Sequence, residues 1–492
     1  MPDAIAPSRA SFEAYVCSPV RARTDSAWLG GAFLGSVDAM AGSSSGKGRG
    51  LRFDIDLGSA TSKSGRLQAH EPMDILMIAD CSGRRARGLT APLAGRRARS
   101  ISVDNLDAVF AAWGAEIVVE LDGLAVSLSP RSLEDMHPDQ LLRNTALVSS
   151  PSSRLEPSPS AAPAATGDLL ERLLGAPAGG SARPASPASA DGPQRVVGEL
   201  IRSAVSGAAF SQGPSGEQQA RDSAAALELG RRLRALLHSA PFRALESTWR
   251  AIDGVCRNCP DEELVRFQVL DASLPELHGD LNAFTALLEA QRPSLVVVDD
   301  SVDASAEALG ALQPLLRACA AQGAILAIGA SPALAGYPSF EASAVLPEDV
   351  TPPASAVDAW EELARTRAEG AQLALSLPRY LLRQPYGKLG ESLDRLAFEE
   401  VLDGDHEAFL WGNGAYLVAR ALAERHVGGG SQLDGSVELG DLPIVRLPDE
   451  DGYRLQPSAE AWLSERRVER LRDAGFTVLQ SVRDSDRLRV HI

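Results

Sequence analysis

The sequence predicts a mixed α/β (α+β) protein with a small N-terminal domain and a larger C-terminal domain. Short aliphatic runs alternate with helical patterns over much of the chain, which is typical of a parallel sheet covered by helices. One Asp-Gly pair between two alternating segments indicates a β-hairpin. A stretch rich in Pro, Ala and Ser separates the two groups of elements. With 492 residues, 45% of them hydrophobic, the chain is long enough for more than one packed domain.

The boundary between the two groups of predicted elements is a change in composition after residue 148. Residues 149–193 are rich in Pro, Ala and Ser and contain no aromatic residue, so they cannot bury enough apolar surface to offset the entropy of folding. We therefore expect a flexible linker between two folded domains. The predicted divisions are an N-terminal extension with a Gly/Ser tether (1–50), a small domain (51–148), the linker (149–217) and a large domain (218–492).

The small domain begins with a predicted half-buried strand over residues 51–57. Leu51, Phe53, Ile55 and Leu57 alternate with charged residues, which is the period of a strand with one buried face. An ordinary edge strand of the same domain has the same pattern. Inside the linker, four leucines at helical spacing predict a short amphipathic helix that needs an apolar partner. They are Leu169, Leu170, Leu173 and Leu174.

The other elements follow from periodicity and turn residues. The apolar run Met73–Ala79 predicts a buried strand, and residues 104–113 have a helical pattern. Asp122 and Gly123 join two alternating segments and predict a two-residue hairpin turn. In the large domain, helices are predicted over 218–238, 242–255, 360–369, 413–426 and 458–474, and parallel strands over 265–270, 294–298 and 324–328.

Composition excludes several classes of function. The 48 Lys and Arg residues against 65 Asp and Glu residues give a formal charge of −17, which argues against nucleic-acid binding. No apolar run approaches the roughly 18 residues of a membrane span, and the first residues lack a secretory signal. The five cysteines are an odd number without a disulfide pattern. We expect a cytoplasmic protein without membrane insertion.

Two motifs suggest ligand sites, but their spacing argues against them. The glycine-rich stretch at 42–48 has three residues between its glycines and no Ser or Thr after Lys47, so it lacks the phosphate-loop pattern. Cys256 and Cys259 have the spacing of half a zinc site, but no second pair follows, and we expect two thiols at a helix end. We expect no cofactor.

The remaining candidates for a catalytic or metal-binding site are Asp299, Asp300 and Asp303. They follow the predicted strand at 294–298, and carboxylates at the carboxyl ends of parallel strands often bind ligands or metals. Capping of the next helix explains the same residues equally simply. An enzyme that uses this cluster is therefore an alternative hypothesis, and no catalytic triad or histidine motif accompanies it.

Beyond the linker, several motifs in order resemble the large sheath subunit of the type VI secretion system. The central motif is Leu-Pro-Arg followed by Leu-Arg-x-Pro-Tyr-Gly within residues 370–387, and others precede and follow it over about 250 residues. Before the linker, shorter motifs resemble the small sheath subunit. The residues that carry these resemblances are Trp249, Arg250, Pro378, Arg379, Arg383, Pro385, Tyr386, Gly387, Trp411, Gly412 and Asn413 in the large domain, and Asp80, Ser82 and Gly83 in the small one.

The resemblance implies a structural subunit that is not an enzyme. Sheath subunits of this system assemble around an inner tube on a baseplate and contract to propel the tube, and a hexameric ATPase recycles them. It implies that Leu51, Phe53, Ile55 and Leu57 form a strand donated to another subunit. It also implies that the helix with Leu169, Leu170, Leu173 and Leu174 contacts the ATPase; docking of this helix on the protein's own surface is the alternative. The chain stops soon after its last matching motif, and residues 1–41 match nothing in the small subunit, which leaves a sheath-like cap or baseplate adaptor as the alternative.

Overall fold

The computed structural model describes residues 71–143, 216–341, 350, 353–402, 404–429, 435–449 and 452–492. The predicted strand at 51–57, the glycine-rich stretch and the leucines of the linker lie outside these residues. The helices are α1 (Leu106–Trp113), α2 (Pro138–Leu141), α6 (Gly216–Leu237), α7 (Ala240–Arg257), α8 (Leu274–Gly279), α9 (Leu281–Gln291), α10 (Ala306–Ala321), α11 (Val357–Ala368), α12 (Ala415–Val427) and α13 (Glu465–Asp473).

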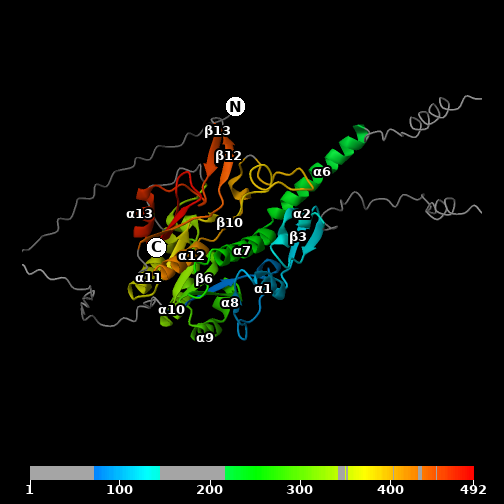
Figure 1. The fold of residues 1–492 in the computed structure, drawn as a ribbon. Helices are drawn as coiled ribbons and strands as arrows, with labels where there is room; N and C mark the ends of the chain where they lie inside the picture. Colours follow the sequence, from blue (N-terminus) through cyan, green and yellow to red (C-terminus); the bar gives the residue numbers. More distant parts are fainter. Residues whose placement is uncertain are drawn as a thin grey trace, which may run out of the picture. The chain divides into compact units, whose positions relative to one another are not determined.

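A nine-stranded sheet is the centre of the described fold (Figure 1). Its order is β11-β15-β14-β8-β7-β6-β1-β5-β2, and the strands from β14 to β5 are parallel. Three pairs of short strands lie outside it. The strands are β1 (Met73–Ala79), β2 (Arg99–Ile101), β3 (Ile117–Leu121), β4 (Leu124–Leu128), β5 (Val265–Asp271), β6 (Leu295–Val302), β7 (Ile325–Ala330), β8 (Leu373–Leu377), β9 (Tyr380–Leu381), β10 (Trp411–Gly412), β11 (Ser436–Leu439), β12 (Val445–Asp449), β13 (Gly452–Gln456), β14 (Thr477–Ser481) and β15 (Leu488–His491).

The structure confirms the α/β class and most of the predicted elements. The hairpin of β3 and β4 turns at Asp122 and Gly123, whose φ angles of 52° and 75° are those of a type I′ turn. The helix predicted over 458–474 is shorter, because α13 begins only at Glu465. Residues 458–460 are extended instead: Ser458 accepts a hydrogen bond from the Leu381 amide, and the Glu460 amide donates to the Arg379 carbonyl oxygen.

The residues on the two sides of the linker do not form separate cores. The sequence predicts two domains, but β1, which precedes the linker, lies between β5 and β6, which follow it. The cause is visible in β1 itself, where all but one of the seven residues are buried. Met73, Ile75 and Met77 join one core with α7 and α12, while Leu76 and Ile78 join the other with α9 and α10. A strand that is apolar on both faces belongs inside a parallel sheet with helices on both faces, and β5, β6 and these four helices all come after the linker.

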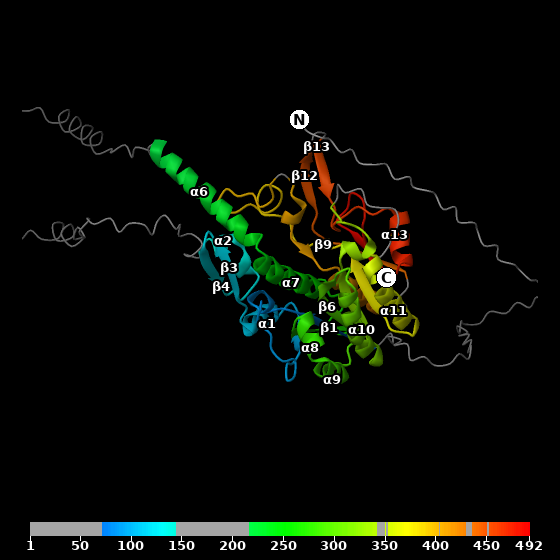
Figure 2. The same ribbon diagram turned by 180° about the vertical axis from the view of Figure 1, so that it is seen from behind.

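Two smaller features extend away from this sheet. Figure 2 shows the first part of α6 and the ribbon of β12 and β13 extending outward, as Figure 1 does from the other side. Leu227 in α6 is 77% exposed, and so is Tyr453 in β13. The second part of α6 is anchored to the hairpin, because the Arg231 guanidinium donates to both carboxylate oxygens of Asp122 at 2.7 Å. Within the described residues, every helix is too short or too polar to cross a bilayer.

Candidate functional site

The motif residues of the large domain converge on a buried ion-pair group that we call the Arg383 network. It consists of Glu246 and Arg250 on α7 and of Arg383, Tyr386 and Glu400 in the long segment after β9. Arg383 donates to Glu246 Oε1 at 2.8 Å and to both oxygens of Glu400 at 2.7 and 2.8 Å. Arg250 donates to Glu246 at 2.7 Å and to the Tyr386 hydroxyl at 3.0 Å. Two carboxylates and two guanidiniums thus compensate one another inside the protein.

Charge compensation decides the protonation of Glu246. Burial alone would raise the pKa of this carboxyl, but the charges and hydrogen bonds of Arg383 and Arg250 outweigh it and hold the pKa at about 2. Removing any one of the four charged members leaves an uncompensated buried charge, which is costly. The network therefore fixes the segment after β9 against α7, and Pro385 and Gly387 lie in the turn of that segment. Gly387 has a φ of +121°, and a Cβ there would lie 2.6 Å from the Phe398 carbonyl oxygen.

A second group, the Arg379 cluster, lies beside the first at the end of β8. It consists of Arg379, His406, Glu407, Glu460 and Trp411, and it follows the cis peptide bond between Leu377 and Pro378. Arg379 Nη2 donates to Glu407 at 2.9 Å and also binds Glu460, and His406 Nε2 lies 3.2 Å from Glu460. Burial would raise the pKa of Glu460, but hydrogen bonds from His406 and Arg379 hold it at about 2.

The Arg379 cluster has the composition of a metal site but the arrangement of an ion-pair group. Ligand atoms of His406, Glu407 and Glu460 lie within 4.8 Å of one another. Arg379 Nη2, however, already bridges Glu407 and Glu460, and its positive charge stands where a cation would bind. These residues fit a fixed structural contact better than a metal.

Trp411, Gly412 and Asn413 connect this cluster to the sheet. The Trp411 indole donates to the His406 carbonyl oxygen at 3.0 Å. A Cβ at Gly412 would lie 2.8 Å from the Leu382 side chain, so only glycine fits there. The Asn413 amide donates to the Asp300 carbonyl oxygen at 2.7 Å, and its oxygen accepts from the Ala415 amide at the start of α12. Asn413 thereby holds α12 to the end of β6.

The three aspartates singled out by the sequence do not act together. Asp299 and Asp300 lie within β6, which extends to Val302, and not after it as predicted. Asp299 is half-buried and accepts a hydrogen bond from Thr248 at 2.6 Å, and its partial burial raises its pKa. Asp300 pairs with Arg85 at 2.7 Å, and Asp303 accepts from the Ser305 amide just before α10. Each carboxylate has its own structural partner, although Asp299 and Asp300 also line a cavity of about 500 Å³.

The two cysteines of the C-x-x-C pair lie at the end of α7, as predicted. Both are free thiols, and burial raises the pKa of Cys256 to about 12. Among the described residues, no histidine or further cysteine completes a metal site with them. A thiol with so high a pKa is a poor nucleophile at neutral pH.

A third group of contacts joins the two sides of the linker. Trp249 on α7 is fully buried, stacks on Phe110 at 4.0 Å between ring centroids, and donates its indole N–H to the Cys81 carbonyl oxygen at 3.0 Å. Ser82 donates its hydroxyl to Asp271 at 2.8 Å. Asp80 accepts hydrogen bonds from two amides of the turn that follows β1. Ser82 and the neighbouring Cys81 therefore contact residues after the linker, whereas Asp80 holds the turn on its own side.

Sequence reasoning missed several partners in this third group. Glu276 on α8 accepts hydrogen bonds from Arg84 and Arg96, and those bonds keep its pKa at about 2 although burial alone would raise it. Gly83 has a φ of +71°, and a Cβ there would lie 2.8 Å from the Glu116 carbonyl oxygen. The only available signal for Asp271 was its place at the end of a strand. No local pattern marks Phe110 or Glu276 as a partner across the linker.

Paired charges, stacked rings and tight glycines hold loops of the described fold against its parallel sheet. Residues 224–292 and 290–490 match the family described as VipB (EvpB/VC_A0108), tail sheath N-terminal domain, and the chain belongs to that family.

One curated relative gives a more particular comparison. The type VI secretion system sheath protein TssC1 of Pseudomonas aeruginosa is 28% identical to the chain over 278 residues. The matching part is 51% of this chain and 55% of that protein, so the chain spans about half the length of the curated relative it matches. The family match begins after the linker, at residue 224.

Proposed function

We propose that the chain is a structural subunit of a type VI secretion contractile sheath, with small-subunit-like and large-subunit-like segments fused in one chain. The observation that carries this proposal is the place of β1. Seven residue pairs join β1 to β5 and four join it to β6, so a strand from before the linker lies between two strands that come after it. Two sheath segments that interlock in this way function as one unit, and the linker raises their effective concentration.

In this role the subunit assembles with other sheath subunits around an inner tube on a baseplate, and contraction of the assembly propels the tube. The strand with Leu51, Phe53, Ile55 and Leu57 is the proposed donor to another subunit. The linker helix with Leu169, Leu170, Leu173 and Leu174 is the proposed contact of the recycling ATPase. Both segments lie outside the described residues, and their sequence patterns are what support these two assignments.

Electron microscopy of assembled protein tests the proposal. We would express the full chain alone and together with the inner-tube protein of the same system, and look for tubes by negative staining. Regular hollow cylinders support the sheath. Folded monomers or small rings under both conditions would contradict polymerisation and favour the cap or baseplate adaptor.

A deletion separates the strand donor from the rest of the chain. Removing residues 51–57 is expected to abolish long assemblies and to leave the described fold intact, because none of its strands comes from that segment. Removing seven residues from the linker, 151–157, is the matched control and is expected to leave assemblies unchanged. Tubes of normal length after the first deletion would show that this segment is not the donor.

A further inference from the structure

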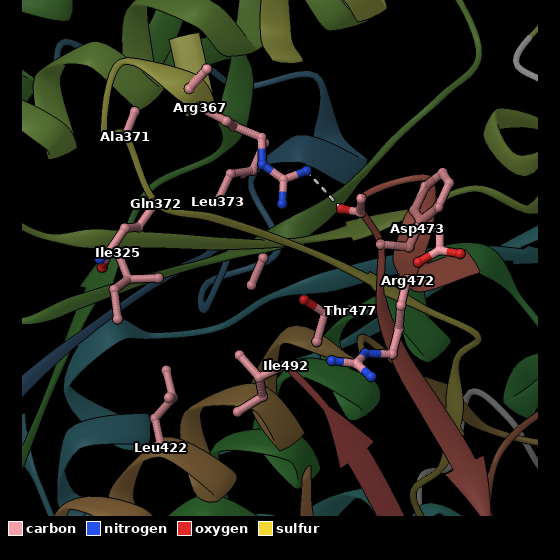
Figure 3. Close-up of a pocket in the computed structure, with 14 residues that line it drawn as sticks. Ile325, Arg367, Ala371, Gln372, Leu373, Leu422, Arg472, Asp473, Thr477 and Ile492 are labelled. Atoms are coloured by element: carbon pink, nitrogen blue, oxygen red, sulfur yellow. Dashed lines mark hydrogen bonds between the residues drawn. The ribbon is translucent and has the colours of Figure 1, made fainter. Parts of the chain in front are cut away.

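A cavity of about 670 Å³ opens at the amino ends of β7, β8 and β14, and we call it the Arg367 slot. Figure 3 shows its two chemically different sides. Arg367 from α11 and Arg472 from α13 point into it from one side, and Ile325, Leu422 and Ile492 form an apolar side. Asp473 also lines the slot, but it forms no ion pair with Arg367.

Arg367 lacks an anionic partner among the described residues. Its guanidinium donates one hydrogen bond, to the Gly475 carbonyl oxygen at 2.8 Å, and no described carboxylate lies within 4.0 Å. Burial lowers the pKa of Arg367. Gly475 has a φ of +97°, and a Cβ there would lie 2.5 Å from Arg367 Nη1, so this glycine leaves room for the guanidinium. A half-buried positive charge without a counter-ion is costly, and a carboxylate in the slot would offset that cost.

The slot also exposes one side of a strand. Residues 373–376 of β8 pair with β7, whereas β14 pairs with β8 only at Ser376 and Leu377. In the part of the chain that is described, Leu373, Ala374 and Leu375 therefore have a strand on one side only. The unpaired main-chain N–H and C=O groups of such a strand edge can form hydrogen bonds with an additional extended segment. The occupant of the slot should thus be an extended peptide that carries carboxylates.

The ribbon of β12 and β13 has these properties. The two strands pair with each other and with no other described strand, so both edges of the ribbon are open. Val445 and Leu447 are buried at its base, while Tyr453 near its tip is 77% exposed. In the sequence, Asp449 at the end of β12 is followed directly by Glu450 and Asp451, so three acidic residues stand in a row before β13. In both ribbon views the ribbon and α11 lie at different places on the described fold, so the ribbon does not reach the slot of its own copy (Figures 1 and 2).

We propose that the tip of this ribbon, residues 449–453, docks in the Arg367 slot of a second copy of the chain. The acidic side chains pair with Arg367, an edge of the ribbon lies along β8, and Tyr453 covers the apolar side formed by Leu422 and Ile492. Because the tip and the slot are different surfaces, the contact is heterologous and adds copies in a row. The inference rests on the proposed sheath function, since it names a contact by which copies would assemble.

Charge reversal tests the electrostatic part of the contact. Arg367→Glu is expected to reduce self-association in sedimentation or light scattering by about tenfold or more, because it places like charges together. Arg365→Glu is the matched control, since Arg365 lies on the same helix and its partner is Glu362 on the surface. Adding Glu450→Lys and Asp451→Lys to Arg367→Glu is expected to restore association. If circular dichroism shows that Arg367→Glu is misfolded, Arg367→Met removes the charge without repulsion.

Cysteine cross-linking tests the geometry without requiring tubes. One tagged copy carries Tyr453→Cys and a copy with a different tag carries Gln372→Cys, and mild oxidation is expected to yield a dimer with both tags. Leu89→Cys, an exposed position elsewhere, replaces Tyr453→Cys in the control, and the parent chain gives the background. Normal tubes with no specific cross-link and no effect of Arg367→Glu overturn this contact and leave the sheath function standing. Cross-links without tubes support the contact and contradict the sheath.

Discussion

Replacing Trp249 with alanine should weaken the contact between the segments before and after the linker and destabilise the fold. The side chain is fully buried, and truncating a buried tryptophan costs about 3–5 kcal/mol. Two further losses put the expected cost at the upper end of this range, about 4–5 kcal/mol. The stacked pair with Phe110 is lost, and the buried Cys81 carbonyl oxygen loses its donor. A domain with the usual stability of about 5–15 kcal/mol would lose a large part of it.

The measurement is a urea titration followed by far-ultraviolet circular dichroism. Trp360→Ala is the matched control, since Trp360 is only partly buried on the other core and should cost about 1–2 kcal/mol. Trp249→Phe retains a ring to stack on Phe110 but loses the hydrogen bond and part of the buried ring, so it should fall between the two. If Trp249→Ala is no more destabilising than Trp360→Ala, the reasoning about the contact across the linker is refuted.

Four other predictions rest on the shared sheet, the buried ion pairs and the close approach at Gly387. After cleavage at a protease site engineered into the linker, the two fragments should elute together in size-exclusion chromatography, because β1 lies within the sheet. Separate elution of the N-terminal fragment would contradict the shared core. Glu246→Gln should destabilise the fold by about 3–5 kcal/mol in urea titrations, since Arg250 loses its carboxylate partner and Arg383 keeps only one of its two. Glu246 and Glu460 have pKa values of about 2 in the folded protein, below their ordinary 4.5. The free energy of unfolding should therefore be constant above about pH 5 and fall as the pH is lowered towards 2. A constant free energy of unfolding across this range would argue against these ion pairs. Gly387→Ala should destabilise the fold more than Gly370→Ala does, by at least about 1 kcal/mol in thermal unfolding. Both glycines have a positive φ, but only at Gly387 would a Cβ also meet a backbone oxygen. Equal losses of stability would show that this close approach is unimportant.

The local elements were the most predictable part of the molecule. Met73–Ala79, the hairpin at Asp122 and the three central strands of the large domain lie where periodicity and turn residues indicated. The helix at 458–474 was predicted too long because its first residues have a helical pattern, yet they pair with the segment after β8. Tertiary contacts outweighed local propensity at that point.

The candidate site was predictable only as a set of motif residues. The order of motifs indicated that Arg379, Arg383, Tyr386 and Trp411 matter, but no pattern showed that two separate ion-pair groups form around Arg383 and Arg379. Their partners come from α7, from the segment near residue 400 and from Glu460, which are far apart in sequence. Ion pairing between such residues depends on distances that only the folded chain defines.

The sequence by itself determined where most of the described strands and helices lie and which motifs relate the chain to sheath proteins. It determined these because periodicity, turn residues and composition are local properties. The tertiary structure decided that β1 lies between β5 and β6, so that the segments before and after the linker share one sheet and two cores. An apolar strand shows that it is buried on both faces but not which strands flank it, since those neighbours are chosen by main-chain pairing across almost two hundred residues of sequence.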